Sequence, residues 1–295
     1  MKVLLYGKHG WIGQKVYDLL IKDNHEVIVG NIRAEDFEGL EEEIKNVQPT
    51  NIISTIGRTH GTIEGVNYTT IDYLEQKGKL RENIRDNLYS PTILAIISKK
   101  YGIHYAYLGT GCIFTYDETH PYEEESNGFT EESRPNFFGS SYSTVKGYTD
   151  MIMKMFDNVL NVRIRMPITD EVNSRNFITK ITTYKKICSI SNSMTVLPEL
   201  LPIMIDMCDK KVTGTVNLTN PGLISHNEIL EMYKDIVDKD FTWENFNIEE
   251  QKKILASERS NNFLDTRRLE SLYKVKNIKD SVRDILYKMK ENREI

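Results

Sequence analysis

The chain has 295 residues, of which 39% are apolar and 27% charged, a composition typical of a folded globular protein with a sizeable core. Its net charge of −5 argues against nucleic acid or an anionic membrane surface as the main partner. No apolar run approaches the ~20 residues that span a bilayer, and the apolar start is too quickly interrupted for a signal peptide. The three cysteines, Cys112, Cys188 and Cys208, have no metal-like spacing. We therefore expect a reducing cytoplasmic location, with no metal site and no disulfide.

Short apolar runs alternate with helical patterns over the first half of the chain. An apolar run at 3–6 ends in a glycine turn, and apolar residues then recur at helical spacing from Ile12 to Leu20. Further strands are predicted at 26–29, 51–56, 104–108, 162–166 and 215–218, and helices at 35–47, 80–100 and 142–156. This alternation predicts an α/β fold in which a doubly wound parallel sheet is covered by helices on both faces.

The pattern changes after about residue 167. Helical segments are predicted at 177–186, 200–210, 225–237, 248–257 and 278–290, with little strand between them. We interpret 1–167 as the sheet domain, to which 211–220 return as a strand. Residues 168–295 form mainly a smaller, mostly helical substrate-binding region at the carboxyl ends of the strands, where open α/β sheets bind ligands. Residues 116–136 are acidic and aperiodic, and we expect a surface loop near the mouth of the site.

The glycine turn carries the first functional motif. Gly7-Lys8-His9-Gly10-Trp11-Ile12-Gly13 is a GxxGxxG string that follows a strand and opens a helix. Glycines there let backbone N–H groups approach a pyrophosphate, and the helix N-terminus favours its negative charge. The string alone is common and also occurs as a turn used only for packing. Its strand–turn–helix context favours dinucleotide binding.

The residues after the second strand discriminate between two cofactors. An NAD site usually places a carboxylate there, whereas an NADP site favours a cation for the 2′-phosphate. The chain reads Val29-Gly30-Asn31-Ile32-Arg33, and the acids Glu35 and Asp36 follow only later. We therefore predict a preference for NADPH, with Arg33 on the 2′-phosphate. The alternative is a solvated arginine.

The predicted helix 142–156 carries a tyrosine and a lysine four positions apart. Tyr142 and Lys146 share one helix face, and a nearby lysine lowers the pKa of a tyrosine, so that it can protonate an oxygen. Thr110 and Cys112 follow the predicted strand 104–108, and in extended backbone they project to the same side. Both motifs have ordinary alternatives, since YxxxK is frequent in helices and cysteine is often a small core residue.

These stretches resemble the extended short-chain dehydrogenase/reductase superfamily. The chain is most similar to the plant-type bifunctional UDP-4-keto-6-deoxy-glucose 3,5-epimerase/4-reductases, and more distantly to the bacterial dTDP-4-keto-rhamnose reductases. The likeness covers nearly the whole chain. It is most specific at Gly7–Gly13, at 110–114, at 135–137 leading into Tyr142–Lys146, at 163–168, at 175–180, at 220–222 with 225–228, and at 259–262.

The resemblance implies a Rossmann domain over 1–167 that binds NADP, and two reactions in one pocket. Cys112 matches the base and Lys180 the proton donor that invert C3 and C5 beside a C4 ketone. Tyr142 matches the acid for reduction of C4, while Lys146 holds the nicotinamide ribose and Thr110 positions the oxygen. The predicted cofactor-binding residues are Gly7, Gly10, Trp11, Ile12, Gly13, Arg33, Ile56, Gly57, Tyr142, Lys146 and Pro167. The predicted substrate-binding residues are Thr110, Gly111, Cys112, Asn176, Lys180, Arg259 and Asn261.

Several positions leave alternatives open. The chain has Ser54-Thr55-Ile56-Gly57 where many relatives carry Asn-Ala-Ala-Gly, so a side-chain role there is in doubt. Lys180 equally suits a solvated helix position, and Arg259 and Asn261 equally suit a turn. A 4-reductase alone and a non-catalytic nucleotide-binding subunit of the same fold therefore remain as alternatives to the bifunctional enzyme. A 4,6-dehydratase is disfavoured because Gly111 and Cys112 replace its acidic pair.

The resemblance also implies partners. The substrate is a UDP-sugar, although UDP rather than dTDP rests on resemblance alone. A separate 4,6-dehydratase must supply it. A homodimer that pairs the helices predicted at 80–100 and 142–156 is expected by analogy.

Overall fold

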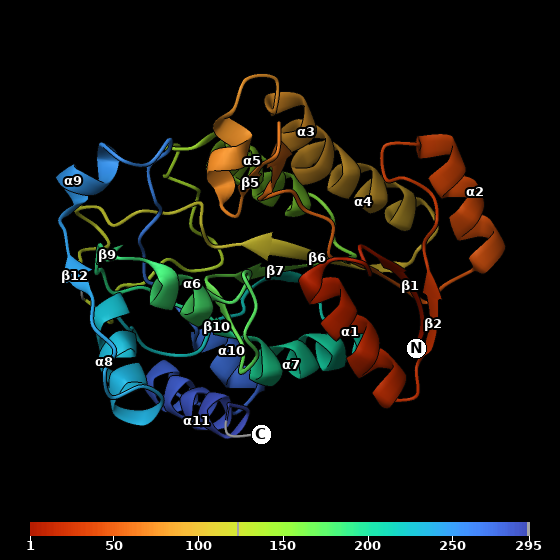
Figure 1. Ribbon diagram of the computed structural model, residues 1–295. Helices are drawn as coiled ribbons and strands as arrows, with labels where there is room; N and C mark the ends of the chain where they lie inside the picture. The colour runs from red at the N-terminus through yellow and green to blue at the C-terminus, as the bar shows by residue number, and fades with distance from the viewer. Residues whose placement is uncertain (123, 294–295) are drawn as a thin grey trace.

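The computed structural model describes residues 1–122 and 124–293. Its centre is a six-stranded parallel sheet with the strand order β11-β7-β6-β3-β1-β2 (Figure 1). This architecture confirms the predicted doubly wound α/β fold. The chain reverses its direction of strand addition between β1 and β3, and ligands bind at such a switch point. The strands are β1 (Lys2–Tyr6), β2 (Glu26–Val29), β3 (Asn51–Ser54), β6 (His104–Thr110), β7 (Val159–Ile164) and β11 (Gly214–Asn217).

Two helical layers cover the sheet. On one face, α1 (Trp11–Lys22) and α7 (Leu197–Asp209) pack against it, and on the other face lie α2 (Phe37–Val47), α4 (Ser90–Lys100) and α5 (Ser141–Met153) (Figure 1). Helix α7 therefore completes the sheet layer, although it lies within the range predicted as mainly substrate-binding.

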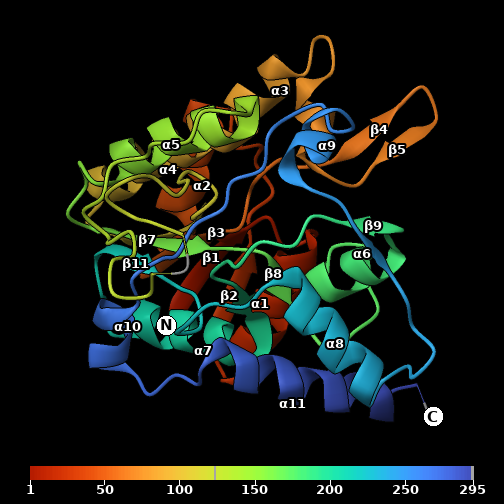
Figure 2. The same cartoon turned by 90° about the vertical axis from the view of Figure 1, so that its left-hand side faces the viewer.

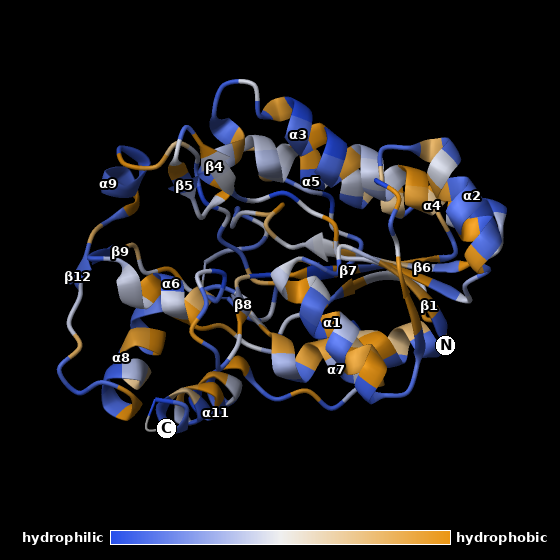
Figure 3. Cartoon of the chain, turned by 45° about the vertical axis from the view of Figure 1, so that its right-hand side comes forward, coloured by the Kyte–Doolittle hydropathy of each residue, from blue (hydrophilic) through white to orange (hydrophobic). Residues whose placement is uncertain are grey.

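Alternation along the strands decides which face each side chain covers. Val3 and Leu5 belong to the core on the α1 and α7 side, whereas Leu4 and Tyr6 belong to the core on the opposite side. All four side chains are at most 2% exposed. Figure 3 shows β1 in the hydrophobic colour between the two layers. Burial of both faces explains why this strand is continuously apolar.

The helix predicted at 80–100 contains a wider turn. It consists of α3 (Leu80–Ile84), a π-helical turn η2 (Arg85–Tyr89) and α4. Within the π turn, Asn87 accepts a hydrogen bond from the backbone N–H of Arg58 at 3.0 Å and donates one to its carbonyl oxygen at 2.9 Å. The wider turn therefore places an amide against the segment that follows β3.

The C-terminal region forms a second core at one end of the molecule (Figure 2). The helices that contribute to this core are α6 (Phe177–Thr183), α8 (His226–Ile236) and α11 (Ile278–Glu291). Two shorter helices of the region, α9 (Ile248–Lys252) and α10 (Arg267–Leu272), contribute none of its described residues. The region contains four strands of two residues each that the sequence did not indicate. They pair as β8 (Pro167–Ile168) with β10 (Thr195–Val196), and β9 (Lys186–Ile187) with β12 (Glu244–Asn245).

Two further segments differ from the sequence-based expectation. The hairpin β4 (Gly61–Ile63) and β5 (Val66–Tyr68), followed by the 3-10 turn η1 (Ile71–Glu75), was not predicted. The segment predicted as a surface loop at 116–136 is exposed only in part. Phe129 is 2% exposed and stacks on Phe114, which draws the second half of the segment into the interior.

No helix in the described ranges is long and apolar enough to cross a membrane.

A buried ion pair ties α5 to the sheet. Arg163 on β7 and Asp150 on α5 are 0% and 3% exposed. The Arg163 Nε and Nη2 atoms each donate to an Asp150 oxygen at 2.8 Å. A third nitrogen, Nη1, donates to the carbonyl oxygen of Thr130 at 3.0 Å. This bidentate pair fixes the helix that carries Tyr142 and Lys146.

We predict that Asp150→Asn lowers the free energy of unfolding by about 3 kcal/mol, because it leaves the Arg163 charge buried without its partner. Urea unfolding followed by circular dichroism measures the loss. The control is Asp280→Asn, which removes an exposed ion pair with Arg283 and should leave the transition unchanged. Equal transitions for both variants would contradict the prediction.

Candidate active site

The glycine turn after β1 is closely packed. Gly7 has a φ of +86°, and a Cβ atom there would lie 2.6 Å from the Thr55 hydroxyl and 2.9 Å from the Ile56 nitrogen. A Cβ atom on Gly13 would lie 2.0 Å from the Gly7 carbonyl oxygen. Side chains are therefore excluded at both positions, and the turn from β1 meets the segment after β3 at the switch point. This is the geometry that a bound dinucleotide requires.

The start of α1 fits a negatively charged group. Its N-cap is Gly10, no side chain caps the first turn, and the first turn contains no acidic residue. The Trp11 indole N–H donates to Glu171, which also pairs with Lys15 at 2.9 Å. Backbone N–H groups of a helix N-terminus favour an anion. Glu171 comes from the segment after β8, so the C-terminal region contacts the glycine turn directly.

The remaining predicted cofactor residues are distributed over several segments. The Arg33 side chain is 68% exposed and pairs with Glu35 at 2.7 Å. Ile12 and Ile56 are partly buried against opposite cores of the sheet. Gly57 lies beside Asn87, since a Cβ atom there would be 3.4 Å from the Asn87 amide oxygen. Pro167 begins β8, paired with Thr195.

Three predicted catalytic residues lie together at the carboxyl end of β6. Thr110 ends the strand, and its hydroxyl accepts a hydrogen bond from the Cys112 N–H at 3.0 Å. Cys112 packs against the small cluster of buried residues that contains Tyr142. Burial and the Cys112 side chain raise the pKa of the Tyr142 phenol above its usual range, while hydrogen bonding to Thr110 opposes this rise. The three polar groups therefore act on one another.

Lys146 is buried one turn after Tyr142. The residue is 4% exposed, and burial lowers the pKa of its ammonium to about 7, while Asp150 and Cys112 oppose the decrease. Its Nζ donates to the Tyr107 hydroxyl and to the Leu108 carbonyl oxygen. Lys146 thus approaches the end of β6 from α5.

Lys180 lies on α6, and Arg175 is a second cation that acts on it. Its Nζ donates to the Thr69 carbonyl oxygen at 3.3 Å. Burial, together with Arg175 and Arg259, lowers the pKa of Lys180 to about 8. No hydrogen bond joins Lys180 to Cys112 within the described chain. The charge that couples to both Lys180 and Tyr142 is that of Arg175.

Arg175 is a site residue that the sequence reasoning did not select. Its Nη2 donates to the Thr59 hydroxyl at 2.7 Å, whereas the buried Nη1 has no hydrogen-bond partner among the described residues. Its charge also lowers the pKa of Tyr142. The signal was present, because Arg175 opens a stretch that carries the family resemblance. Its partners come from distant segments and were not visible in the sequence.

Most of the predicted substrate-binding residues are already engaged within the protein. Asn176 is completely buried and caps α6, with its amide bonded to the backbone of Thr169, Glu171 and Ile178. A Cβ atom on Gly111 would lie 2.5 Å from a methyl carbon of Leu264 and 2.9 Å from the Arg165 Cγ atom, so a side chain is excluded there. These contacts favour positioning roles, and direct substrate contact at both residues stays a prediction.

Arg259 and Asn261 come from the segment between α9 and α10. The Arg259 Nη1 and Nη2 atoms donate to the two carboxylate oxygens of Asp72 at 3.0 and 2.9 Å. Asp72 was not among the residues predicted from the sequence. Asn261 accepts from Asn192 at 2.9 Å and donates to the Arg259 carbonyl oxygen. The segment is thereby fixed against η1, and its contact with a nucleotide stays a prediction.

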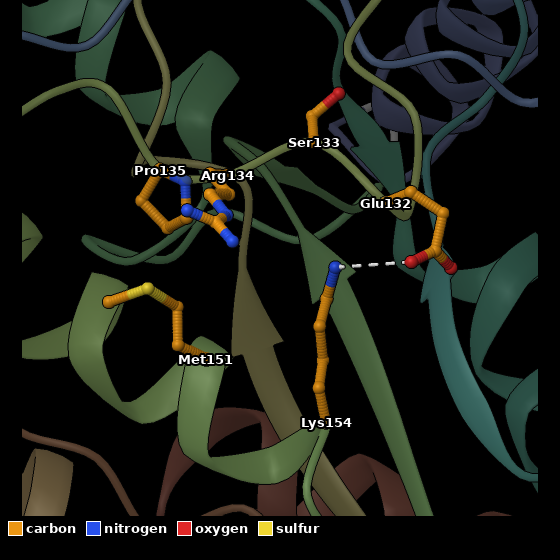
Figure 4. A pocket seen from close by; sticks show the side chains of 6 residues that line it. All are labelled: Glu132, Ser133, Arg134, Pro135, Met151 and Lys154. Carbon is orange, nitrogen blue, oxygen red and sulfur yellow. Dashed lines mark ion pairs between the residues drawn. The ribbon is translucent and has the colours of Figure 1, made fainter.

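A surface hollow elsewhere is unrelated to these residues. It lies between 132–135 and the end of α5 (Figure 4), where Lys154 and Glu132 approach to 3.9 Å. None of the predicted site residues lines it.

Comparisons with known proteins identify the family of the chain. Residues 1–141 match the family described as the RmlD substrate binding domain. The UDP-rhamnose synthase of Acanthamoeba polyphaga mimivirus is 53% identical, covers 98% of this chain and 99% of that protein, and superposes with a TM-score of 0.93. A dTDP-4-dehydrorhamnose reductase of Bacillus anthracis, solved in complex with NADP, has a TM-score of 0.74 at 16% identity, over 97% of this chain and 99% of that one.

Plant relatives match over nearly the full chain. The bifunctional dTDP-4-dehydrorhamnose 3,5-epimerase/dTDP-4-dehydrorhamnose reductase of Arabidopsis thaliana is 40% identical over 99% of this chain and 94% of the relative. A trifunctional UDP-glucose 4,6-dehydratase/UDP-4-keto-6-deoxy-D-glucose 3,5-epimerase/UDP-4-keto-L-rhamnose-reductase of the same plant is 42% identical over 96% of this chain. The chain spans only 41% of that trifunctional protein.

We predict that Lys180→Met raises the free energy of unfolding at pH 7 by on the order of 2 kcal/mol, since it removes a desolvated ammonium. Below pH about 8, Lys180 is protonated in both the folded and the unfolded chain, and the full penalty is present. Between about 8 and the ordinary value of 10.5, the folded chain loses this proton first. The wild type then regains stability, and the difference should shrink.

Urea unfolding at pH 7 and pH 9.5 tests this sign. The control is Lys185→Met, at an exposed position just beyond the same helix, for which we expect no such pH dependence. A Lys180→Met variant that is less stable at pH 7, or whose advantage grows with pH, would show that the lysine is not penalised by burial.

Proposed function

Because the chain belongs to the RmlD substrate-binding domain family of extended short-chain dehydrogenase/reductases, as the sequence resemblance indicated, we propose that it converts UDP-4-keto-6-deoxy-D-glucose to UDP-L-rhamnose. It acts as a 3,5-epimerase and a 4-reductase that uses NADPH. The observation that carries this proposal is the grouping of Cys112 with Thr110 and Tyr142 at the carboxyl end of β6. The thiol proposed to transfer a proton, Cys112, thus lies beside the two hydroxyls proposed to bind the carbonyl oxygen, those of Thr110 and Tyr142.

Epimerisation uses the acidity that the C4 ketone gives to C3 and C5. The Cys112 thiolate takes the proton from one carbon, and the electron pair moves onto the C4 oxygen. The Tyr142 and Thr110 hydroxyls donate to this developing enolate oxygen. Lys180 then returns a proton to the opposite face of the carbon, which inverts it. Lys146 and Arg165 place cationic side chains beside the Cys112 side chain.

Reduction uses the same carbonyl-binding pair. NADPH, when bound, supplies the hydride for C4. Tyr142 gives its proton to the C4 oxygen, while Thr110 holds that oxygen. Arg175 keeps positive charge near the tyrosine as it loses its proton, and Lys146 lies one turn further along the same helix. The residues that would hold the cofactor are the glycine turn, the segment at Ile56 and Gly57, and Lys146, with Arg33 at the 2′-phosphate.

The proposal implies a supplier of the substrate. The chain has Gly111 and Cys112 after Thr110, which provide no carboxylate for removal of the C5 proton and the C6 hydroxyl. A separate 4,6-dehydratase therefore makes the 4-keto sugar.

A homodimer is also proposed, in which the helical segments at 80–100 and 142–156 pair across a two-fold axis. Large apolar side chains are exposed there, including Tyr148 at 53% and Met155 at 81%. Size-exclusion chromatography with light scattering measures the oligomeric state, and a monomer at micromolar concentration would refute this part.

The function is tested by incubating the purified protein with NADPH and either UDP- or dTDP-4-keto-6-deoxy-glucose, with the product sugar identified by NMR. We expect UDP-L-rhamnose from the UDP substrate. NADPH that stays unoxidised with these two sugars and with pre-epimerised UDP-4-keto-L-rhamnose would refute the enzyme, and turnover of only the pre-epimerised sugar would show a 4-reductase alone.

We predict that Cys112→Ala slows deuterium incorporation from D2O at C3 and C5 by at least about 100-fold, because a general base contributes at least this factor. Reduction of pre-epimerised UDP-4-keto-L-rhamnose should stay within a few-fold of wild type. The control Cys188→Ala removes a buried thiol directly after β9 and should leave deuterium incorporation unchanged. Wild-type incorporation by Cys112→Ala would remove the epimerase role.

We predict that Arg33→Ala raises the KM for NADPH about 10-fold, because a cation–phosphate contact is lost, and leaves the KM for NADH unchanged. Initial rates with both cofactors give the ratio. Arg283→Ala, an exposed arginine of α11, serves as the control. An equal change for both cofactors would show that Arg33 does not recognise the 2′-phosphate.

A further inference from the structure

Strand β6 contributes a second tyrosine to the proposed site. The Tyr107 hydroxyl accepts a hydrogen bond from Lys146 Nζ, and the same Nζ lies 4.5 Å from the centre of the Tyr107 ring. Tyr107 is 1% exposed and Lys146 is 4% exposed. The contact links residues 39 positions apart, and the YxxxK spacing gives no indication of it.

Lys146 has no carboxylate partner among the described residues. The nearest attractive carboxylate is Asp150, and both of its oxygens accept hydrogen bonds from Arg163. The other titratable group that acts on Lys146 is Cys112, which follows β6. Tyr105, Tyr142 and Asp150 are the titratable groups that act on Tyr107. Tyr107 is thus the side chain that directly holds the amine.

A neutral phenol differs from a carboxylate as a partner for lysine. Burial raises the pKa of Tyr107, so its hydroxyl stays protonated. The phenol oxygen accepts from an ammonium, and its O–H can donate to a neutral amine. In either case the partner fixes the nitrogen without cancelling its charge. A carboxylate in this place would neutralise the lysine and weaken its effect on Tyr142.

We propose that Tyr107 is a positioning residue, whose hydroxyl fixes Lys146 Nζ at the end of β6 while leaving its positive charge to act on Tyr142 and the nicotinamide ribose. This inference rests on the proposed reduction. Tyr107 itself acts only through Lys146, whose pKa burial lowers to about 7. Because a charge-assisted hydrogen bond stabilises the ammonium, removal of the phenol oxygen should lower the Lys146 pKa further.

The test compares Tyr107→Phe with Tyr105→Phe. Tyr105 lies two residues earlier on the same face of β6, belongs to the same core and is 0% exposed, so its substitution removes an equally buried hydroxyl that does not bond to Lys146. The titration of Lys146 is followed by NMR of 13C-labelled lysine, with the signal assigned by its loss in Lys146→Met. The pH profile of NADPH oxidation and the KM for NADPH are measured in parallel.

We expect the Lys146 midpoint to fall by about one pH unit in Tyr107→Phe. The pH above which NADPH oxidation declines should fall with it, and the KM for NADPH should rise several-fold. Tyr105→Phe should match the wild type in all three measurements. Tyr107→Gln, which retains an acceptor oxygen, should keep the Lys146 midpoint near that of the wild type.

A Tyr107→Phe protein with the wild-type midpoint would overturn the inference, and so would a Gln variant that titrates like the Phe variant. Failure of the proposed function gives a different result. The wild type would then not oxidise NADPH with any 4-keto sugar, whereas the Lys146 titration would still report its coupling to Tyr107.

Discussion

All six strands of the sheet run in the same direction, and every functional group depends on this constraint. Their carboxyl ends form one edge, so the turn after β1, the segment after β3 and the residues ending β6 come together without being neighbours in the chain. Burial of both sheet faces leaves the side chains of the strand interiors no access to a ligand. The proposed site therefore lies at this edge, where α5 contributes Tyr142 and Lys146 and α6 contributes Lys180.

The proposed site also contains several buried cationic side chains that form no ion pair with a carboxylate among the described residues. Lys146, Arg175 and Lys180 are buried to different degrees, and desolvation lowers the pKa of each. A folded protein retains such groups at a cost in stability when a ligand or a reaction needs them. A nucleotide sugar, which carries a diphosphate and develops an oxyanion at its ketone, matches this arrangement. The proposed reaction thus accounts for charges that packing alone would disfavour.

Local patterns of the sequence were sufficient for the sheet and the glycine turn. Strand alternation, helical spacing and the GxxGxxG string each act over a few residues. The structure contains the six strands of the sheet and the helices that they indicate, although the helix predicted at 248–257 ends at Lys252. The two-residue strands of the C-terminal region escaped because their pairing is long-range and their runs are too short to show a period.

Neighbouring side chains of the candidate site could be predicted where they belong to one short motif. They could not be predicted where they come from segments far apart in the chain. The spacing of Tyr142 and Lys146 indicated a shared helix face, and Cys112 was placed beside Tyr142. Tyr107, the Arg175–Thr59 contact and the Asp72–Arg259 pair each join elements far apart in the chain. No local pattern encodes such partners, and only the fold brings them together.

The bidentate pair between Arg163 and Asp150 has a consequence for how this protein tolerates change. Asp150 follows Lys146 by one turn on α5, so the same anchor that keeps the helix folded also sets where the amine and the phenol stand. Substitutions near this anchor would alter turnover and folding together. Selection for either property therefore acts on both, and the helix should accept new residues only in compensated combinations.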